Sequence, residues 1–201
     1  MTPVARKTPV ARKTPAAGKT PAALKTRATL KTWAALNTRA ALKIDLLVES
    51  ELWADDAGSM ARRAVTEAAA MLSTPSSELA IVLTDDSAIR SLNRVWRGVD
   101  AATNVLSFPA TRSGGKPPLI GDIVLAYETI ADEARTERKP FAHHVAHLAV
   151  HGFLHLLGYD HVQGKEAEAM ERLERDVLRR LAIPDPNGLR SKPDIRRPIS
   201  R

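Results

Sequence analysis

The chain has 201 residues, of which 44% are hydrophobic and 26% charged, a balance typical of one globular domain with flanking segments. It contains no cysteine, which excludes disulfides and every cysteine-ligated zinc or iron–sulfur site. No apolar run reaches about 18 residues, and none follows the basic N-terminus as in a secretory signal, so we expect a cytoplasmic protein without a membrane span.

The net charge of +7 is unevenly distributed along the chain. Residues 1–43 contain ten basic and no acidic residues, and residues 184–201 contain five basic and two acidic ones. The segment between them, 44–183, carries a net charge of −6. Basic tails bind polyanions through counterion release without any sequence recognition. The charge therefore predicts a folded domain over 44–183 and says little about nucleic-acid binding by that domain.

The first segment is a repeat of seven hexads that each begin with threonine, from TPVARK at Thr2 to TRAALK at Thr38. Six residues carry too little apolar surface to stack as a solenoid, and proline in the early copies interrupts a helix. The composition predicts a disordered arm over 1–43, with at most a fraying helix from about Leu24 to Leu42. Contact with RNA or the ribosome is one interpretation of this arm, and a tandem expansion without function is the one that we favour.

Strand-like and helical segments alternate after the arm, which predicts an α/β (α+β) domain with one small mixed sheet. Ser59 is expected to cap the first helix, Asp85 or Asp86 to cap the second, and Gly158 to end the fourth in a left-handed turn. Residues 184–201 contain four prolines and are expected to form a basic tail. The predicted elements are about four strands, at 44–48, 78–84, 105–108 and 119–126, and about five helices, at 59–72, 85–96, 127–138, 143–157 and 163–182.

All six histidines lie between His143 and His161. His151 and His155 are four residues apart on a predicted helix, so their rings leave the same face. Gly158 then allows the chain to reverse and to return His161. Three neutral imidazoles leave one position of a zinc ion open, which is typical of a catalytic rather than a structural site. The spacing predicts one Zn²⁺ ion bound by these three histidines at the helix C-terminus and the following turn.

The spacing of the three histidines is that of the long metalloprotease signature, with one decisive difference. The protease needs a glutamate directly after the first histidine as its general base, and this chain has Gly152 there. A zinc site without that carboxylate still binds water and polarises an oxygen. The pattern therefore indicates a metallohydrolase, and the missing glutamate argues against a protease.

Other residues of this segment are expected to have secondary roles. His147 lies one turn before His151 and is expected to orient a ligand or to contact the substrate. His143 and His144 lie near the helix start and are expected to be exposed. Asp160 is expected to accept a hydrogen bond or a proton, or to be a turn residue only.

The segment HGFLHLLGYDH at 151–161 resembles, almost letter for letter, the signature of the YbeY family of bacterial endoribonucleases. Residues 87–109 and the triplet Gly121-Asp122-Ile123 resemble two further segments of that family, so the similarity covers about 44–182. The resemblance implies a single-domain, zinc-dependent endoribonuclease that is specific for single strands. It also implies a role in 3′ end maturation of small-subunit ribosomal RNA and in ribosome quality control, with RNA, the small ribosomal subunit and its assembly factors as partners.

By the same resemblance, His151, His155 and His161 are the metal ligands, and Arg97 is the catalytic arginine. A guanidinium suits this role because it stays charged and donates two parallel N–H groups to a phosphate in the transition state. A surface ion pair with Asp100 is the alternative role of Arg97. The nucleophile is either a metal-activated water or the 2′-OH of the RNA, because Gly152 supplies no base.

Two other functions remain open from the residues alone. One is a different metal-dependent hydrolase, such as a peptidase or a phosphoesterase. The other is a non-catalytic ribosome-assembly factor in which the metal is structural.

Overall fold

The computed structural model describes residues 42–53, 56–110, 118–159 and 164–185. The predicted arm up to residue 41, the tail from residue 186, and both Asp160 and His161 lie outside these ranges. Within them, one four-stranded sheet and five α-helices confirm the predicted mixed α/β class. None of the helices in these ranges is long and apolar enough to cross a membrane.

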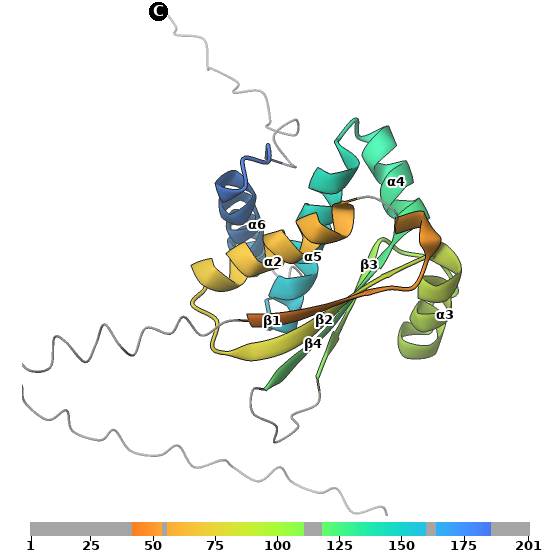
Figure 1. Cartoon of the computed structure of the whole chain (residues 1–201), viewed down its shortest axis with the longest axis horizontal. Helices are drawn as coiled ribbons and strands as arrows, with labels where there is room; N and C mark the ends of the chain where they lie inside the picture. The colour runs from red at the N-terminus through yellow and green to blue at the C-terminus, as the bar shows by residue number, and fades with distance from the viewer. Residues whose placement is uncertain (1–41, 54–55, 111–117, 160–163, 186–201) are drawn as a thin grey trace, which may run out of the picture. The chain divides into compact units, whose positions relative to one another are not determined.

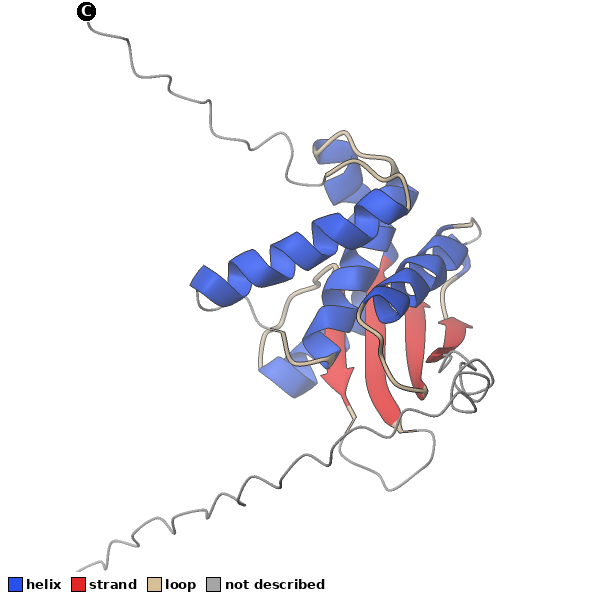
Figure 2. Ribbon diagram, turned by 90° about the vertical axis from the view of Figure 1, so that its left-hand side faces the viewer, coloured by secondary structure: helices blue, strands red, loops and turns tan. Residues whose placement is uncertain are grey.

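The strands are β1 (Leu42–Val48), β2 (Ser77–Thr84), β3 (Val105–Pro109) and β4 (Leu119–Ala126). They lie side by side in one sheet of order β1-β2-β4-β3 (Figure 2). β1 pairs parallel with β2 and β2 parallel with β4, whereas β3 pairs antiparallel with β4. Parallel neighbours need a crossover connection, and a helix provides it between β1 and β2. β3 is consequently an outer strand of the sheet.

The α-helices are α2 (Ala57–Met71), α3 (Asp86–Arg97), α4 (Tyr127–Thr136), α5 (Phe141–Leu156) and α6 (Gly164–Arg180), and a short 3₁₀ turn, η1 (Glu51–Trp53), follows β1. Side chains alternate between the two faces of β4. Ile123 and Leu125 join the core formed with α2, α5 and α6, whereas Val124 and Ala126 pack with Ile89 of α3. The core that includes α2, α5 and α6 thus lies on one face of the sheet, and α3 lies on the other (Figure 1).

α5 is the central helix of the larger core and is buried on most of its surface. Such an all-round apolar helix needs partners on every side. Gly152 shows how closely it packs on the sheet, because a Cβ atom there would lie 2.9 Å from Ser107 Oγ and 3.0 Å from Ile123 Cγ2. The Ser107 hydroxyl also donates a hydrogen bond to the Gly152 carbonyl at 3.1 Å. These contacts fix the position of the histidines that α5 carries.

Most element boundaries differ from the sequence expectations by one or two residues, and two of these differences have a clear structural reason. β1 begins at Leu42 rather than at Ile44, because Leu42 already pairs with Ser77. α2 begins at Ala57 after Asp56, so Ser59 lies inside the first turn and is not its cap. The expectation for α3 is confirmed, since the Asp85 carboxylate accepts a hydrogen bond from Ala88 N at 2.8 Å.

Candidate functional site

A cavity of about 580 Å³ lies between α3, β3 and the C-terminal end of α5. It brings together Arg97, the last residue of α3, with His151 and His155 of α5. His161 lies outside the described residues, so the structure places three of the four predicted site residues around one cavity. The remaining lining residues are Thr103, Asn104, Val105, Ser107, Gly158 and Tyr159.

The two histidines face each other across one turn of α5, as the four-residue spacing predicts. Their Nε2 atoms are 3.1 Å apart, and their rings meet edge to face with centroids separated by 4.6 Å. Gly158 has a φ of 89°, which confirms the expected left-handed turn after the helix. This turn brings the Tyr159 carbonyl back to His155, whose Nδ1–H donates to it at 3.0 Å.

Besides His155, His151 contacts Glu174 on α6. The Glu174 carboxylate lies 2.8 Å from His151 Nδ1 and 3.1 Å from His147 Nε2, and its side chain is only 6% exposed. Burial raises the pKa of the Glu174 carboxyl, but the hydrogen bonds from His147 and His151 outweigh it and lower the pKa from 4.5 to about 2. The carboxylate is therefore ionised and accepts the Nδ1–H of His151.

These hydrogen bonds test whether the residues fit a metal ion. Both Nδ1 atoms are donors, to a carbonyl and to a carboxylate, so each neutral ring keeps its lone pair on Nε2. The two Nε2 atoms point toward each other at 3.1 Å, a geometry that a shared proton or a cation between them stabilises. Neutral imidazoles with fixed tautomers are the form in which histidine binds zinc. The pair fits a divalent ion, although the described residues contain no group of three side chains that could hold one.

Comparison with known proteins places the chain in a family. The sequence model described as endoribonuclease YbeY matches residues 47–182. A protein of Nitrobacter hamburgensis named endoribonuclease YbeY is 53% identical over 152 residues, which cover 71% of this chain and 80% of that protein. A protein of the same name from Rhodopseudomonas palustris is 50% identical, over 71% of this chain and 90% of its own.

The chain belongs to the YbeY family. The family's name describes endoribonucleases, which are hydrolases that act on RNA. The solution structure of a Thermotoga maritima protein aligns over 77% of this chain and 99% of its own, with 22% identity and a TM-score of 0.44, a similarity too low to bear on function.

The span matched by the YbeY model contains Arg97, whose side chain is exposed. Asp100, the alternative partner named above, instead forms a two-pronged ion pair with Arg90, at 2.8 and 3.0 Å. The hydrogen bonds from Arg90 hold the pKa of the Asp100 carboxyl below its usual value. Arg97 forms no ion pair with any residue in the described ranges, so its guanidinium is available to an anion in the cavity.

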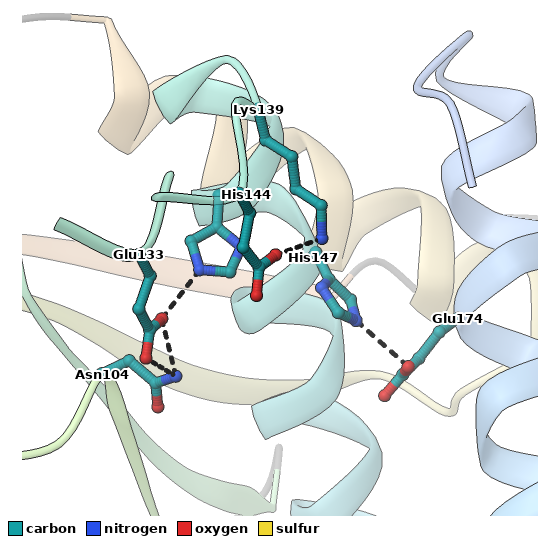
Figure 3. A network of polar contacts seen from close by, with 7 residues as sticks. Asn104, Glu133, Lys139, His144, His147 and Glu174 are labelled. Atoms are coloured by element: carbon teal, nitrogen blue, oxygen red, sulfur yellow. Dashed lines mark hydrogen bonds and ion pairs between the residues drawn. The ribbon is translucent and has the colours of Figure 1, made fainter. Parts of the chain in front are cut away.

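His143, His144 and His147 lie away from that cavity. The expectation of exposure is wrong for His144, which is 6% exposed, because Glu133 of α4 accepts a hydrogen bond from its Nε2 at 2.8 Å. His143 is half-buried, and both residues line a separate cavity of about 410 Å³ together with His147. Figure 3 shows Glu133 between His144 and Asn104, whose Nδ2 lies 3.1 and 3.0 Å from the two carboxylate oxygens.

Two carboxylates of this network, Glu174 and Glu133, were not predicted as site residues. A signal for Glu174 was present in the sequence, because it falls on the stripe of α6 formed by Met170, Val177 and Leu178. A charged residue within an apolar helical stripe is buried only with a partner. The partners of Glu133, like those of Glu174, lie on other elements, so the sequence does not identify them.

Proposed function

We propose that this chain is a zinc-dependent, single-strand-specific endoribonuclease that hydrolyses RNA phosphodiester bonds during ribosomal RNA processing. The proposed process is 3′ end maturation of the small-subunit RNA, together with ribosome quality control in the cytoplasm. The proposed partners are ribosomal RNA, the small ribosomal subunit and its assembly factors. Membership of an endoribonuclease family supports the reaction class.

One observation supports the proposal that the domain binds zinc. It is the geometry of His151 and His155, whose Nε2 atoms face each other at 3.1 Å across one helical turn while both Nδ1 atoms contact other groups. In this proposal His151, His155 and His161 together hold one Zn²⁺ ion. When bound, such an ion supplies a Lewis acid that stabilises charge on phosphoryl oxygens and lowers the pKa of water.

The protein's own residues position the RNA and hold protons. Glu174 and the Tyr159 carbonyl keep the Nδ1 protons of His151 and His155, and so keep both tautomers fixed throughout turnover. Arg97 donates N–H groups to the non-bridging oxygens of the phosphodiester, where negative charge increases in the transition state. Gly152 packs on β3 and β4, so its position could not carry a general base even if the residue were changed.

Metal analysis of the purified full-length protein, combined with RNA cleavage assays, tests the proposal. Zinc-loaded protein should cleave single-stranded RNA and spare a duplex, and a chelator should abolish cleavage without unfolding the domain. The double variant His151→Ala/His155→Ala should lose both zinc and cleavage, whereas the control His143→Ala, on the same helix but at the other cavity, should keep both. Full cleavage by the metal-free double variant would contradict the proposal.

The same assays separate the alternatives. Hydrolysis of casein or of a small phosphoester, with RNA left intact, would indicate a different hydrolase. Unfolding upon chelation, with no cleavage of any substrate, would indicate a structural metal. In cells, accumulation of small-subunit RNA with an unprocessed 3′ end upon depletion, restored by wild type and not by the double variant, would support the ribosomal role.

A further inference from the structure

Trp96 is a large aromatic side chain that the fold leaves on the surface. It is 69% exposed, next to Val95, which is 72% exposed, whereas Trp53 is 5% exposed in the core. Its ring contacts Phe108 of β3, with centroids 5.8 Å apart and an angle of 60° between the planes. Grouped exposed apolar side chains mark interaction surfaces more often than isolated ones do. Packing inside the domain therefore does not account for an aromatic residue at this position.

Trp96 and Phe108 line a groove of about 910 Å³ between α3 and its face of the sheet. The groove wall is mostly apolar, with Val82 and Val124 from the central strands. Its two carboxylates are those of Glu49 and Asp122. A phosphate would be repelled by these carboxylates, whereas a flat, uncharged nucleobase fits the apolar wall.

The groove adjoins the candidate site along two pairs of neighbouring residues. Trp96 lines the groove and Arg97 lines the metal-site cavity, and likewise Phe108 lines the groove and Ser107 the cavity. Ser107 and Phe108 diverge because successive side chains of a strand point to opposite faces. β3 therefore separates the two hollows, and it is an outer strand of the sheet. A linear polymer that passes over β3 contacts both hollows.

The charges favour RNA as that polymer. Arg97 is exposed and forms no ion pair with a described residue, so it offers a cation at the boundary between groove and cavity. An aromatic ring next to a free arginine is the combination with which proteins hold single strands, by stacking the base and pairing the phosphate. The carboxylates in the groove complement this arrangement, since they keep the phosphates on the side of Arg97.

We infer that Trp96 is a stacking platform for one unpaired base of the RNA, whose neighbouring phosphate is bound at Arg97. The inference rests on the proposed function and adds a positioning residue to it. A base inside a duplex is stacked and paired and cannot reach the ring, so the platform contributes to the selection of single strands. Trp96 acts on substrate binding rather than on the reacting bond.

A double-mutant cycle, which combines a substitution of Trp96 with removal of one base from the RNA, tests the contact between them. The RNA is a short single strand cleaved at one position, with each nucleotide near that position replaced in turn by an abasic one. With wild-type protein, one abasic position should weaken binding about tenfold, as the loss of one base–aromatic stack does. Trp96→Ala should weaken binding of intact RNA about equally, with the loss in KM rather than in kcat, and should show no further loss at that abasic position.

Two control variants and one fluorescence measurement accompany the cycle. Trp96→Tyr should restore most of the binding, because a smaller ring still stacks. Leu52→Ala, which removes another exposed apolar side chain (45% exposed), should change nothing. In a Trp33→Phe background, RNA should quench the fluorescence of Trp96, with buried Trp53 as a constant contribution, and this signal needs no turnover.

The remaining possible results contradict either the stacking role of Trp96 or the proposed reaction. Unchanged RNA binding by Trp96→Ala, or losses that simply add in the cycle, would overturn the platform. Loss of ribosomal-subunit binding by that variant, with normal affinity for naked RNA, would overturn it in favour of a protein-docking surface. The protein could also show quenched Trp96 fluorescence upon RNA binding and non-additive binding losses in the cycle, but no cleavage of RNA. That result would support the stacking role of Trp96 and refute the proposed reaction.

Discussion

Glu174 illustrates how a single carboxylate orders two imidazoles. It binds His147 and His151 at the same time, and the two hydrogen bonds together lower its pKa to about 2 despite its burial. An ionised acceptor fixes the tautomer of His151 and increases the electron density on its Nε2. Under the proposed function, the residue would thus act on the metal site without facing it.

Replacement of this carboxylate tests that role. Glu174→Gln keeps the size of the side chain but replaces one acceptor oxygen by an NH₂ group, so one of the two histidines loses its acceptor. We expect zinc affinity to fall about 10- to 100-fold, measured by competition with a chelator. The control Glu171→Gln, at an exposed position of the same helix, should leave affinity unchanged. Equal affinities for the two variants would contradict the role.

Substitution of Arg97 tests whether RNA cleavage needs the planar guanidinium or only a positive charge at this position. Arg97→Lys keeps the positive charge and loses the two-pronged donation to phosphate. We expect kcat/KM on single-stranded RNA to fall at least tenfold while zinc content stays the same. Arg62→Lys, on α2, is the matched control. Full activity of the Arg97 variant would show that a point charge is sufficient there.

At the scale of elements, the site depends on the contact between α5 and the sheet. Gly152 lies against Ser107, Val105 and Ile123, so α5 approaches β3 and β4 more closely than any side chain at 152 would allow. The glycine that distinguishes the chain from a metalloprotease is therefore required by packing. The absence of a base next to His151 follows from the architecture.

A methyl group at this contact should be costly. Gly152→Ala should lower the free energy of unfolding by about 1–3 kcal/mol through overpacking, measured by denaturant titration. Adding Ser107→Ala removes the closest contact, 2.9 Å from the new Cβ, so the double variant should lose less than the sum of the single losses. Strict additivity would mean that the contact does not limit the approach.

A second connection between elements runs through Glu133, which joins α4 to His144 of α5 and to Asn104 before β3. Glu133→Ala leaves both partners without their acceptor, and we expect a loss of about 1–3 kcal/mol in unfolding free energy. Because Asn104 lines the candidate site, activity should fall as well. Asp132→Ala, an exposed neighbour on α4 paired only with Arg135 among the described residues, should have little effect on either.

At the scale of the whole molecule, the excess of positive charge lies in residues 1–41 and 186–201, outside the described ranges. The matched family span begins at residue 47, and β1 begins at Leu42. Lys43 forms ion pairs with Asp45 and Glu78, so it belongs to the sheet and not to the preceding arm.

Removal of residues 1–41 should therefore leave turnover of a short RNA nearly unchanged. Binding to long ribosomal RNA at low salt should weaken, and its salt dependence should become shallower, because the arm's cations no longer release counterions. Steady-state kinetics and binding titrations at two salt concentrations measure the two effects. A large loss of turnover on the short RNA at moderate salt would show that the arm contributes to the site.

The sequence alone determined the fold class, the strand Leu119–Ala126 and the facing pair His151 and His155, and it narrowed the cap of α3 to Asp85 or Asp86. These features depend on local periodicity and turn chemistry, which operate within a few residues and can be recognised without the fold. The start of β1 at Leu42 escaped prediction, because its pairing partner lies in another strand.

Only the tertiary structure decided which distant groups meet. The partnership of Glu174 with His151, the burial of His144 against Glu133, and the pairing of Asp100 with Arg90 instead of Arg97 all join residues through packing. The sequence records the charge of each group but not the distance between them, and hydrogen bonds and pKa values depend on that distance. The sequence showed only that Gly152 stands where a metalloprotease has its general base. Its close contact with the sheet became visible only in the structure, because that contact joins residues far apart in the chain.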